Sequence, residues 1–306
     1  MSGRDPESVP VTARPVHPPP VDGEEPGPAG EWAPHERRES DHVTLFPALG
    51  MAALLDRTPA GIESGTPLPW GWHWLYFKPV TPQSELGYDG HARRGDFLPP
   101  LSLPRRMWAG GTLRFFRPLK VGEAAERVST VRSVTPKEGR SGRLAFVTVE
   151  HVISGPDGLA CEEEQNLVYR EAAKDTAAPA PSTPFEGRAD WEESFLPTSS
   201  LLFRFSALTF NAHRIHYDRE YATEREGYPG LVVHGPLLAL LLLDAGIRRT
   251  PDREAATYGY RAVAPAFVDE AVTIVGEAEE DGSALALYAL NRGGNVITQA
   301  TLEWRR

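Results

Sequence analysis

Cysteine is almost absent from the sequence, which contains only Cys161 among 306 residues. A single thiol can form neither an internal disulfide nor a cysteine-based zinc site, and this cysteine usage fits a reducing cytoplasm. We expect Cys161 to pack in the interior as a small hydrophobic side chain. The cysteine content therefore excludes small disulfide-stabilised domains and cysteine zinc domains.

Long apolar runs and an excess of positive charge are also missing. No run reaches the roughly 18 residues that span a membrane, and the N-terminus has no hydrophobic signal region. The 42 acidic residues outnumber the 32 lysines and arginines, which gives a formal net charge of −10. This charge argues against nonspecific binding to nucleic acid or to anionic membranes. The sequence therefore predicts a soluble, cytoplasmic protein that has neither as a partner.

Two segments rich in proline and small residues divide the chain. Residues 1–40 contain "RPVHPPPVDGEEPGPAG" and show no helical or strand periodicity, which predicts a disordered extension. Residues 172–190, "AAKDTAAPAPSTPFEGRAD", predict a semi-extended linker. The remaining ranges, 41–171 and 191–306, are similar in length, and each can bury a core of its own.

The two halves resemble each other. "LRFFRPLKVGEAAERVSTV" can be laid over "YGYRAVAPAFVDEAVTIVG" so that Arg114 falls on Arg261, an offset of 147 residues. Alternating apolar positions and glycine turns follow in both halves, over 143–171 and over 284–305, which predicts long antiparallel strands. We infer a duplication of one structural unit.

Each half also contains a candidate central helix. In the second half, Leu237 to Leu243 are apolar on every face, and such a helix must be enclosed by protein. Residues 43–56 are the analogue in the first half, with more polar positions. Pro236 suits the first helical position, which makes Gly235 the predicted N-cap. The expected fold is therefore α+β, with two curved antiparallel sheets that each wrap a central helix.

The start of the second helix is a candidate anion site. Backbone N–H groups of a first helical turn carry partial positive charge, and glycine lets a ligand approach the backbone closely. His234 and Gly235 are therefore candidates for an oxyanion hole. The alternative is an ordinary capped helix in the core, which Pro236 also fits.

Polar groups are concentrated in "LTFNAHRIHYD", where Asn211, His213 and His216 lie within six positions. Together with "VHG" at 233–235, this stretch resembles the MaoC-like, hydratase 2 family of enoyl-thioester hydratases and dehydratases, which have the hot dog fold. The family motif has an aspartate, a variable residue, an asparagine, a proline, an aliphatic residue and a histidine. The final histidine and the "VHG" match. Asn211, His213 and Arg214 replace the aspartate, the asparagine and the proline.

These replacements point to one branch of the family. With "GWHWLYF" and "FLPPLSLPRRMWAGG", the motif is similar to double hot dog proteins related to 3-methylfumaryl-CoA (mesaconyl-CoA) hydratase, itaconyl-CoA hydratase and the fungal mitochondrial 3-hydroxyacyl-thioester dehydratases. The resemblance covers residues 65–306 and implies a hydro-lyase that acts on an acyl-CoA thioester. It further implies that residues 191–306 carry the catalytic motif and that residues 41–171 shape the pocket.

The implied chemistry assigns roles to the motif residues. Hydration of an enoyl thioester needs a base for the attacking water and donors for negative charge on the thioester oxygen. His216 is the candidate base, because imidazole takes and returns protons near neutral pH. The amide of Asn211 can orient water but cannot act as a base. His213 is either a second titrating group, a residue that fixes the tautomer of His216, or a structural histidine.

Metal binding is a third interpretation of His213 and His216. Their spacing of three residues could place both on one side of a helix, but neither a third ligand nor the familiar zinc motif with an intervening glutamate is visible. We therefore expect no metal and no other cofactor.

Further residues are candidates for binding the substrate. Trp74, in an aromatic stretch, belongs either to a core strand or to a wall of the acyl tunnel. Arg105 and Arg106 are either solvated or bind a CoA phosphate or an acyl carboxylate. Arg214 stands beside the motif histidines, although alternation along an extended segment could turn its side chain away.

The sequence thus predicts a hydratase that adds water to a short branched enoyl-CoA, with conversion of 3-methylfumaryl-CoA to citramalyl-CoA as the first choice. One alternative is an (R)-3-hydroxyacyl-thioester dehydratase of fatty-acid metabolism. A noncatalytic acyl-CoA-binding module is favoured if the asparagine at position 211 has abolished turnover, and a thioesterase is also compatible with the fold. The expected partner is an acyl-CoA substrate, and a homodimer is left open.

Overall fold

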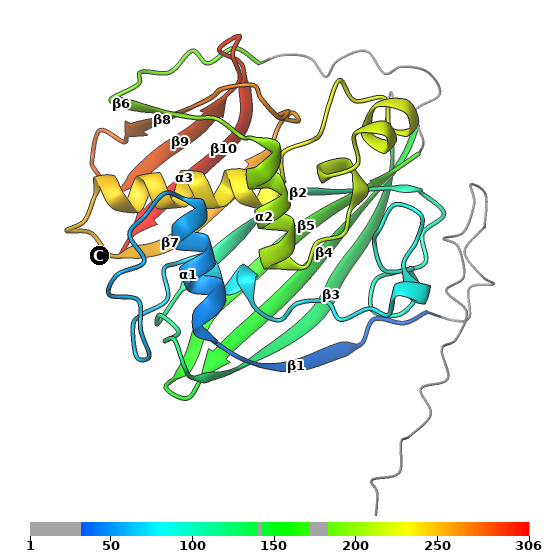
Figure 1. Cartoon of the computed structure of the whole chain (residues 1–306), viewed down its shortest axis with the longest axis horizontal. Coiled ribbons are helices and arrows are strands. Elements are labelled where there is room, and N and C mark those ends of the chain that lie inside the picture. The colour runs from blue at the N-terminus through cyan, green and yellow to red at the C-terminus, as the bar shows by residue number, and fades with distance from the viewer. Residues whose placement is uncertain (1–31, 140–141, 172–182, 306) are drawn as a thin grey trace, which may run out of the picture.

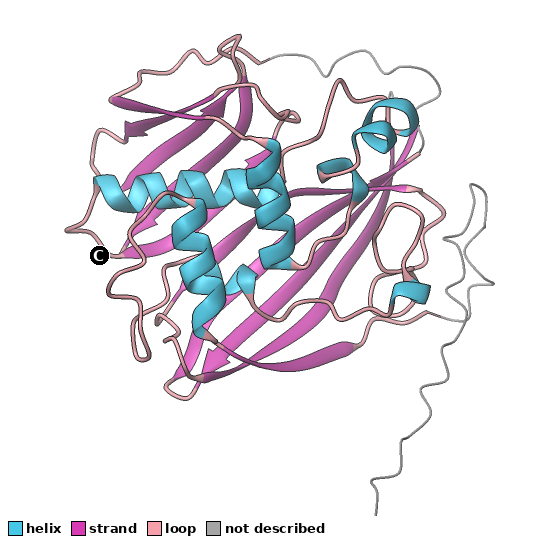
Figure 2. Cartoon of the chain, in the orientation of Figure 1, coloured by secondary structure: helices cyan, strands magenta, loops and turns pink. Residues whose placement is uncertain are grey.

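The computed structural model describes residues 32–139, 142–171 and 183–305. Most of the predicted extension and the first part of the predicted linker therefore lie outside the described residues. Within them, a large antiparallel sheet carries helices on one of its faces (Figures 1 and 2).

The elements follow one another in two similar series. The strands and α-helices are β1 (Glu36–His42), α1 (Leu45–Leu54), β2 (Arg105–Phe115), β3 (Ala124–Gly139), β4 (Gly142–Gly155), β5 (Gly158–Arg170), β6 (Trp191–Phe195), α2 (Ser199–Thr209), α3 (Gly235–Arg249), β7 (Ala255–Ala262), β8 (Val272–Ala278), β9 (Ala284–Leu290) and β10 (Val296–Trp304). The short helices are η1 (Trp72–Leu75), η2 (Gln83–Glu85), η3 (Arg214–His216) and the π-helical turn η4 (Tyr221–Arg225). The strands predicted over 143–171 and 284–305 are present as β4, β5, β9 and β10.

One continuous sheet replaces the two sheets that we expected. Its strand order is β1-β3-β4-β5-β2-β7-β10-β9-β8-β6, and β2 pairs with β7 to join the halves. The junction is tightly packed, because a Cβ atom at Gly110 in β2 would lie 2.4 Å from the carbonyl oxygen of Tyr260 in β7. The prediction of separate sheets was wrong because periodicity identifies strands without showing which edges pair. The backbone N–H and C=O groups along the edge of each half would otherwise be unpaired, and pairing β2 with β7 satisfies them.

The strand order is palindromic. Outward from the β2–β7 junction, equivalent places are occupied by β5 and β10, by β4 and β9, by β3 and β8, and by β1 and β6. The sequence offset described above carries Thr112 onto Gly259, and these two residues pair with each other across the junction. A twofold axis through the junction requires such a pairing. The topology therefore agrees with the predicted duplication.

The helices of the two halves correspond differently from our prediction. α1 follows β1 as α2 follows β6, so α1 is the counterpart of α2 rather than of α3. Between α1 and β2 the described chain contains only η1, η2 and loops. The first half therefore has no described helix equivalent to α3. The apolar composition of residues 43–56 correctly predicted a helix, but composition does not show its place relative to the strands.

Helix α3 lies across the second half of the sheet, against β7, β9 and β10 (Figure 1). Leu237 through Leu243 are all buried, as predicted for a helix enclosed on every side. The N-cap is His234 rather than Gly235, so the helix begins one residue earlier than predicted. Glycine readily adopts helical angles, and proline is tolerated throughout the first turn because no N–H there has an intrahelical acceptor.

Both predicted segment boundaries differ in the structure. β1 begins at Glu36, inside residues 1–40, and pairs with β3 as a polar edge strand. The high proline and glycine content of the whole segment concealed this short strand. At the other boundary, residues 183–185 exchange backbone hydrogen bonds with Gly294 and Val296, so the end of the predicted linker packs against the turn between β9 and β10.

Cys161 is 4% exposed and belongs to the main hydrophobic core, which confirms its predicted packing. Burial raises the pKa of its thiol well above the ordinary value. In the part of the chain that the structure describes, no helix combines the length and apolar character needed to cross a bilayer.

Candidate active site

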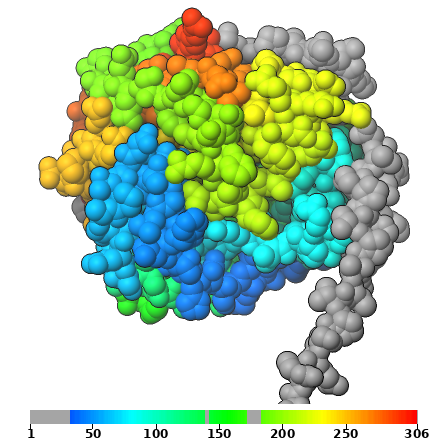
Figure 3. Space-filling view, in the orientation of Figure 1, coloured from blue at the N-terminus to red at the C-terminus, as the bar shows by residue number. Residues whose placement is uncertain are grey.

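A cavity of about 2350 Å³ opens between the two halves. On one side it is lined by β2, β4 and β5 and by the loop 78–98, and on the other by residues 203–217 and the start of α3. Figure 3 shows the face on which the cyan residues of the first half meet the yellow-green residues of the second. The cavity extends over the part of the sheet for which the first half has no equivalent of α3.

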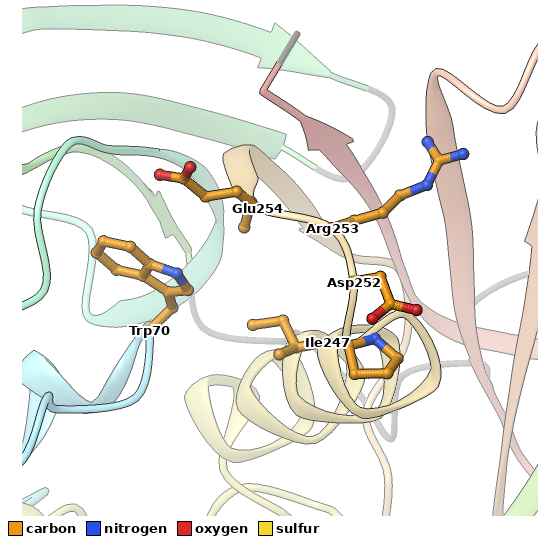
Figure 4. A pocket seen from close by; sticks show the side chains of 7 residues that line it. Trp70, Ile247, Asp252, Arg253 and Glu254 are labelled. Carbon is orange, nitrogen blue, oxygen red and sulfur yellow. The ribbon is translucent and has the colours of Figure 1, made fainter.

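A second, smaller pocket of about 310 Å³ lies at the C-terminal end of α3 (Figure 4). Trp70 and Ile247 line it together with the charged residues Asp252, Arg253 and Glu254. No histidine, serine, threonine or cysteine contributes to its lining. We therefore place the candidate active site in the large cavity.

The motif histidines meet on the wall of this cavity. α2 ends at Thr209, and the left-handed backbone of its C-cap Phe210 (φ 52°) turns the chain into the motif. The ring of His216 stacks on that of His234, with centroids 3.7 Å apart and planes 18° from parallel. His213 presents its ring edge to His216 at 5.4 Å. The structure thus brings together the three histidines that the sequence singled out.

His216 is held in one tautomer. Its Nδ1 atom lies 2.7 Å from the carbonyl oxygen of Val232, and a carbonyl can only accept. Nδ1 therefore carries the hydrogen, and Nε2 keeps its lone pair. Burial lowers the pKa of His216 to about 4, so the ring is neutral at pH 7. A neutral imidazole with an available Nε2 is the form that a general base requires.

Asn211 shapes the turn that carries His213. Its Oδ1 atom accepts a hydrogen bond from the backbone N–H of His213 at 3.0 Å, and its own N–H donates to the carbonyl of Ser206. Both motif residues line the cavity. Burial, followed by the neighbouring His91 and His216, holds the pKa of His213 well below its ordinary value. The amide therefore has a positioning contact in addition to its predicted role toward water.

The start of α3 adjoins the base through His234. This residue is fully buried, and its Nε2 atom shares a hydrogen bond of 2.9 Å with the hydroxyl of Ser206. Gly235 lines the cavity, and a Cβ atom there would lie 2.8 Å from Cε3 of Trp108. Glycine is therefore required for the indole to cover the helix start. The first-turn N–H groups have no intrahelical acceptor and suit an oxyanion.

The three candidate arginines differ in their partners. Arg214 is not among the cavity-lining residues, and its guanidinium binds Asp218 at 2.7 Å. Arg105 lines the cavity but pairs with Glu226 at 3.0 Å. Arg106 also lines the cavity and has no hydrogen-bond or ion-pair partner among the described residues. Of the three, Arg106 is the one available to a ligand.

Aromatic side chains border the same region. Arg106 and Trp108 share one face of β2, because side chains alternate along a strand. Trp74 lines the cavity and meets Trp108 edge-to-face at 5.8 Å. It lies in the 3₁₀ helix η1, so its interpretation as part of a core strand was wrong. Its indole N–H donates to the buried carboxylate of Glu163 at 3.0 Å.

Glu163 itself was missed by sequence reasoning. It is 3% exposed, and its Oε2 atom also lies 3.4 Å from Nε2 of His73. Burial alone would raise the pKa of this carboxyl, but the hydrogen bond from His73 and the charges of nearby histidines lower it to about 2. Glu163 lines the cavity but His73 does not, which favours a structural role for the histidine of this pair.

Asp89 and His91 were also missed. They lie in the loop between η2 and β2, and the His91 ring packs against His213 with centroids 4.0 Å apart. Both residues line the cavity. Their only signal in the sequence is an aspartate two positions before a histidine in a glycine-containing loop. Nothing local indicates that this loop reaches the histidine motif.

Asp89 and His91 provide candidates for the third metal ligand that the sequence did not reveal. Candidate ligand atoms of Asp89, His91 and His213 lie within 4.8 Å of one another. However, both carboxylate oxygens of Asp89 already accept hydrogen bonds from His91. The positive charge of Arg106 also acts on both histidines, which disfavours a cation. The arrangement is better suited to proton transfer.

Comparison with known proteins identifies a family. The model of the hydroxyacyl-thioester dehydratase type 2 family matches residues 71–268. Mesaconyl-C(4)-CoA hydratase of Chloroflexus aurantiacus is 43% identical over 272 residues, which cover 89% of this chain and 96% of the relative. The mitochondrial hydroxyacyl-thioester dehydratase type 2 of Schizosaccharomyces pombe is 31% identical over 237 residues, covering 68% and 77%.

Solved structures show the same fold at low sequence identity. A MaoC-like dehydratase from Phytophthora capsici aligns with a TM-score of 0.63 at 14% identity, over 89% of this chain and 96% of that one. A double hot dog protein of Mycobacterium tuberculosis aligns with a TM-score of 0.55 at 13% identity, over 90% and 97%. The family match and the two sequence relatives show that the chain belongs to the hydroxyacyl-thioester dehydratase type 2 family, with a MaoC-like hot dog fold.

Proposed function

We propose that this protein is a hydratase that adds water to mesaconyl-C4-CoA and forms citramalyl-CoA. Mesaconate is methylfumarate, so its C4 thioester is the 3-methylfumaryl-CoA that the sequence favours. The observation that carries the proposal is the neutral His216, with an available Nε2, beside the start of α3. The same cavity holds Arg106, which has no ion-pair partner among the described residues. The 43% identity to the Chloroflexus hydratase supports the choice of substrate.

The reaction uses two groups of the site, Nε2 of His216 and the backbone N–H of Gly235. Nε2 of His216 takes a proton from water as the water oxygen bonds to the β-carbon of the thioester. The electrons of the double bond move toward the thioester oxygen, where the backbone N–H of Gly235 stabilises the developing charge. The proton then passes to the α-carbon. The same residues run the reverse reaction, so the geometry serves hydration and dehydration alike.

Arg106 provides the selectivity in this proposal. The β-carbon of mesaconyl-C4-CoA carries a carboxylate, and burying that charge requires a cationic or multiply hydrogen-bonding partner. A guanidinium binds a carboxylate with two parallel hydrogen bonds, each worth about 1.5–3 kcal/mol. Two such bonds would favour this substrate over the uncharged crotonyl-CoA by about 10² or more. Arg214 is not part of the proposed substrate site, because it binds Asp218 outside the cavity lining.

The alternatives make different products from the same panel of thioesters. The purified protein is mixed with mesaconyl-C4-CoA, crotonyl-CoA and longer enoyl-CoAs, and the loss of conjugated thioester absorbance is followed. We expect hydration, fastest with mesaconyl-C4-CoA. Equal rates with crotonyl-CoA would move the assignment to a general acyl-thioester dehydratase. Binding without spectral change would identify an acyl-CoA-binding module, and release of free thiol would identify a thioesterase.

A further inference from the structure

The loop between η2 and β2 is clamped onto the histidine motif of the other half. The backbone N–H of Arg214 donates to the carbonyl of Asp89 at 2.9 Å, and its Nη1 atom donates to the carbonyl of Tyr88 at 3.2 Å. Gly90 has a φ of 88°, and a Cβ atom there would lie 1.8 Å from the carbonyl oxygen of Ala212. The contact is possible only with glycine, so the loop is built to reach this motif.

This clamp explains the residue at position 214. The family motif has a proline there, and proline has no backbone N–H with which to bind the carbonyl of Asp89. Arg214 supplies that N–H and adds a guanidinium contact to the same loop. Its role is therefore to hold the loop of the first half against the motif.

Asp89 fixes the orientation of His91. The carboxylate accepts the backbone N–H of His91 through Oδ1 and the ring Nδ1–H through Oδ2, both at 2.9 Å. Because an ionised carboxylate only accepts, Nδ1 carries the hydrogen and Nε2 keeps its lone pair. A carboxylate in this arrangement orients the imidazole and stabilises the imidazolium that forms when the ring takes a proton.

The surroundings of His91 determine its protonation state. The half-buried ring lines the cavity beside His213 and interacts electrostatically with His216. Burial and then the positive charge of Arg106 lower its pKa to about 4, whereas Asp89 acts in the opposite direction. The positive charge of Arg94 lowers the pKa of His91 by a smaller amount. His91 is thus neutral at pH 7, and its conjugate acid readily gives its proton back.

We propose that His91, oriented by Asp89, is a second catalytic residue that helps His216 to hold and deprotonate the attacking water. It fills the role of the family aspartate, which the amide of Asn211 cannot fill. The Nε2 atoms of His91 and His216 each accept a hydrogen bond from one O–H group of the water. As the C–O bond forms at the β-carbon, one O–H bond breaks, and the proton held by an imidazole then forms the C–H bond at the α-carbon. The step needs no other reactant.

This inference rests on the proposed function, and its test separates the two. His91→Ala, His91→Gln and Asp89→Asn are compared with wild type in the full chain, with mesaconyl-C4-CoA as substrate. We expect both His91 variants to lower kcat by about 10²-fold or more, the usual range for a lost proton-transfer group, with little change in KM. Asp89→Asn should lower kcat less, because His91 remains but loses its carboxylate.

His73→Ala is the matched control. His73 is likewise a histidine of the first half with a carboxylate partner, Glu163, but it is buried and does not line the cavity. Its loss should lower the melting temperature and leave kcat within about threefold of wild type. An inactive wild type would contradict the proposed function. An active wild type with an equally active His91→Ala would contradict the role of His91.

Two further readouts do not depend on the substrate. In ¹⁵N NMR spectra, His91 should show a protonated Nδ1 and stay neutral down to about pH 4, and Asp89→Asn should change both properties. A pKa of His91 near the ordinary value of about 6.5 that Asp89→Asn does not change would contradict the pairing of His91 with Asp89. One tightly bound zinc per chain, required for activity and displaced from His91 variants, would instead make these residues metal ligands and overturn the proposal.

Discussion

The base assignment at His216 depends on two neighbours, the carbonyl of Val232 and the stacked ring of His234. His216→Ala removes the available Nε2 and should lower the hydration rate by about two to four orders of magnitude. Folding should survive, as judged by the circular dichroism spectrum. Activity within threefold of wild type would transfer the role of base to His213.

The relative activities of two variants test the role of Asn211. The side-chain oxygen accepts the N–H of His213, and an aspartate can accept the same hydrogen bond while adding a basic group. Asn211→Asp should therefore keep at least part of the activity, whereas Asn211→Ala should be severely impaired in kcat. An alanine variant as active as wild type would exclude Asn211 from the mechanism.

Arg106 should decide between charged and uncharged substrates. Arg106→Ala should reduce kcat/KM for mesaconyl-C4-CoA by about 10²-fold and leave that for crotonyl-CoA nearly unchanged, because only the first substrate has a carboxylate to bind. Arg114→Ala is the control, since Arg114 lies on the same strand but is exposed and paired with Glu162. Equal losses with both substrates would show that Arg106 has another role.

At the scale of elements, the junction between β2 and β7 determines how the halves combine. A Cβ atom at Gly111 would lie 2.2 Å from the backbone of Glu164 and 2.5 Å from the hydroxyl of Tyr260. Gly259 lies in the facing strand, opposite Thr112, with no atom within 4 Å of such a position. The two glycines therefore form a matched pair, one tightly enclosed and one open.

Gly111→Ala should lower the free energy of unfolding by about 1–3 kcal/mol, the cost of overpacking. Gly259→Ala should leave it nearly unchanged or slightly higher, because alanine restricts the unfolded chain at no steric cost. Chemical denaturation of both variants measures the difference. Equal free energies of unfolding for the two variants would show that the residues around Gly111 shift to accommodate a methyl group, which would contradict the close packing there.

At the scale of the whole molecule, the histidines make the protein sensitive to acid. Burial lowers the pKa of the following histidines: His91, His151, His213, His216 and His234. Their pKa in the unfolded chain is about 6.5. Between about pH 6.5 and 4 the unfolded chain therefore binds protons that the folded chain does not, and this difference favours unfolding as the pH falls.

The melting temperature should accordingly be steady near pH 7–8 and fall steeply below about pH 6.5. Each histidine contributes up to about 1.4 kcal/mol per pH unit within its window. His151→Asn should make the decline shallower, because it removes one of the titrating groups. A melting temperature that is constant or rises between pH 6.5 and 5 would contradict this prediction.

The sequence by itself was sufficient for features that depend on neighbours in the chain. The apolar run from Leu237 to Leu243 predicts an enclosed helix because a helix must bury every apolar face. The resemblance to the family was visible because His216 and the "VHG" at 233–235 match a motif whose residues lie close together in the chain. The repeated strands likewise indicate a duplication, since period-two alternation and glycine turns are local signals.

Only the tertiary structure decided which distant groups meet. Pairing of β2 with β7 merged two expected sheets into one, because strand edges combine through backbone groups that every sequence shares. The Asp89–His91 pair reaches His213 across 122 positions, through a contact that depends on Gly90 and the N–H of Arg214. The same packing gave Arg214 a partner in Asp218 and gave Arg106 none among the described residues, although in the sequence the two arginines look alike. Such contacts depend on the packing of whole elements, which local periodicity does not encode.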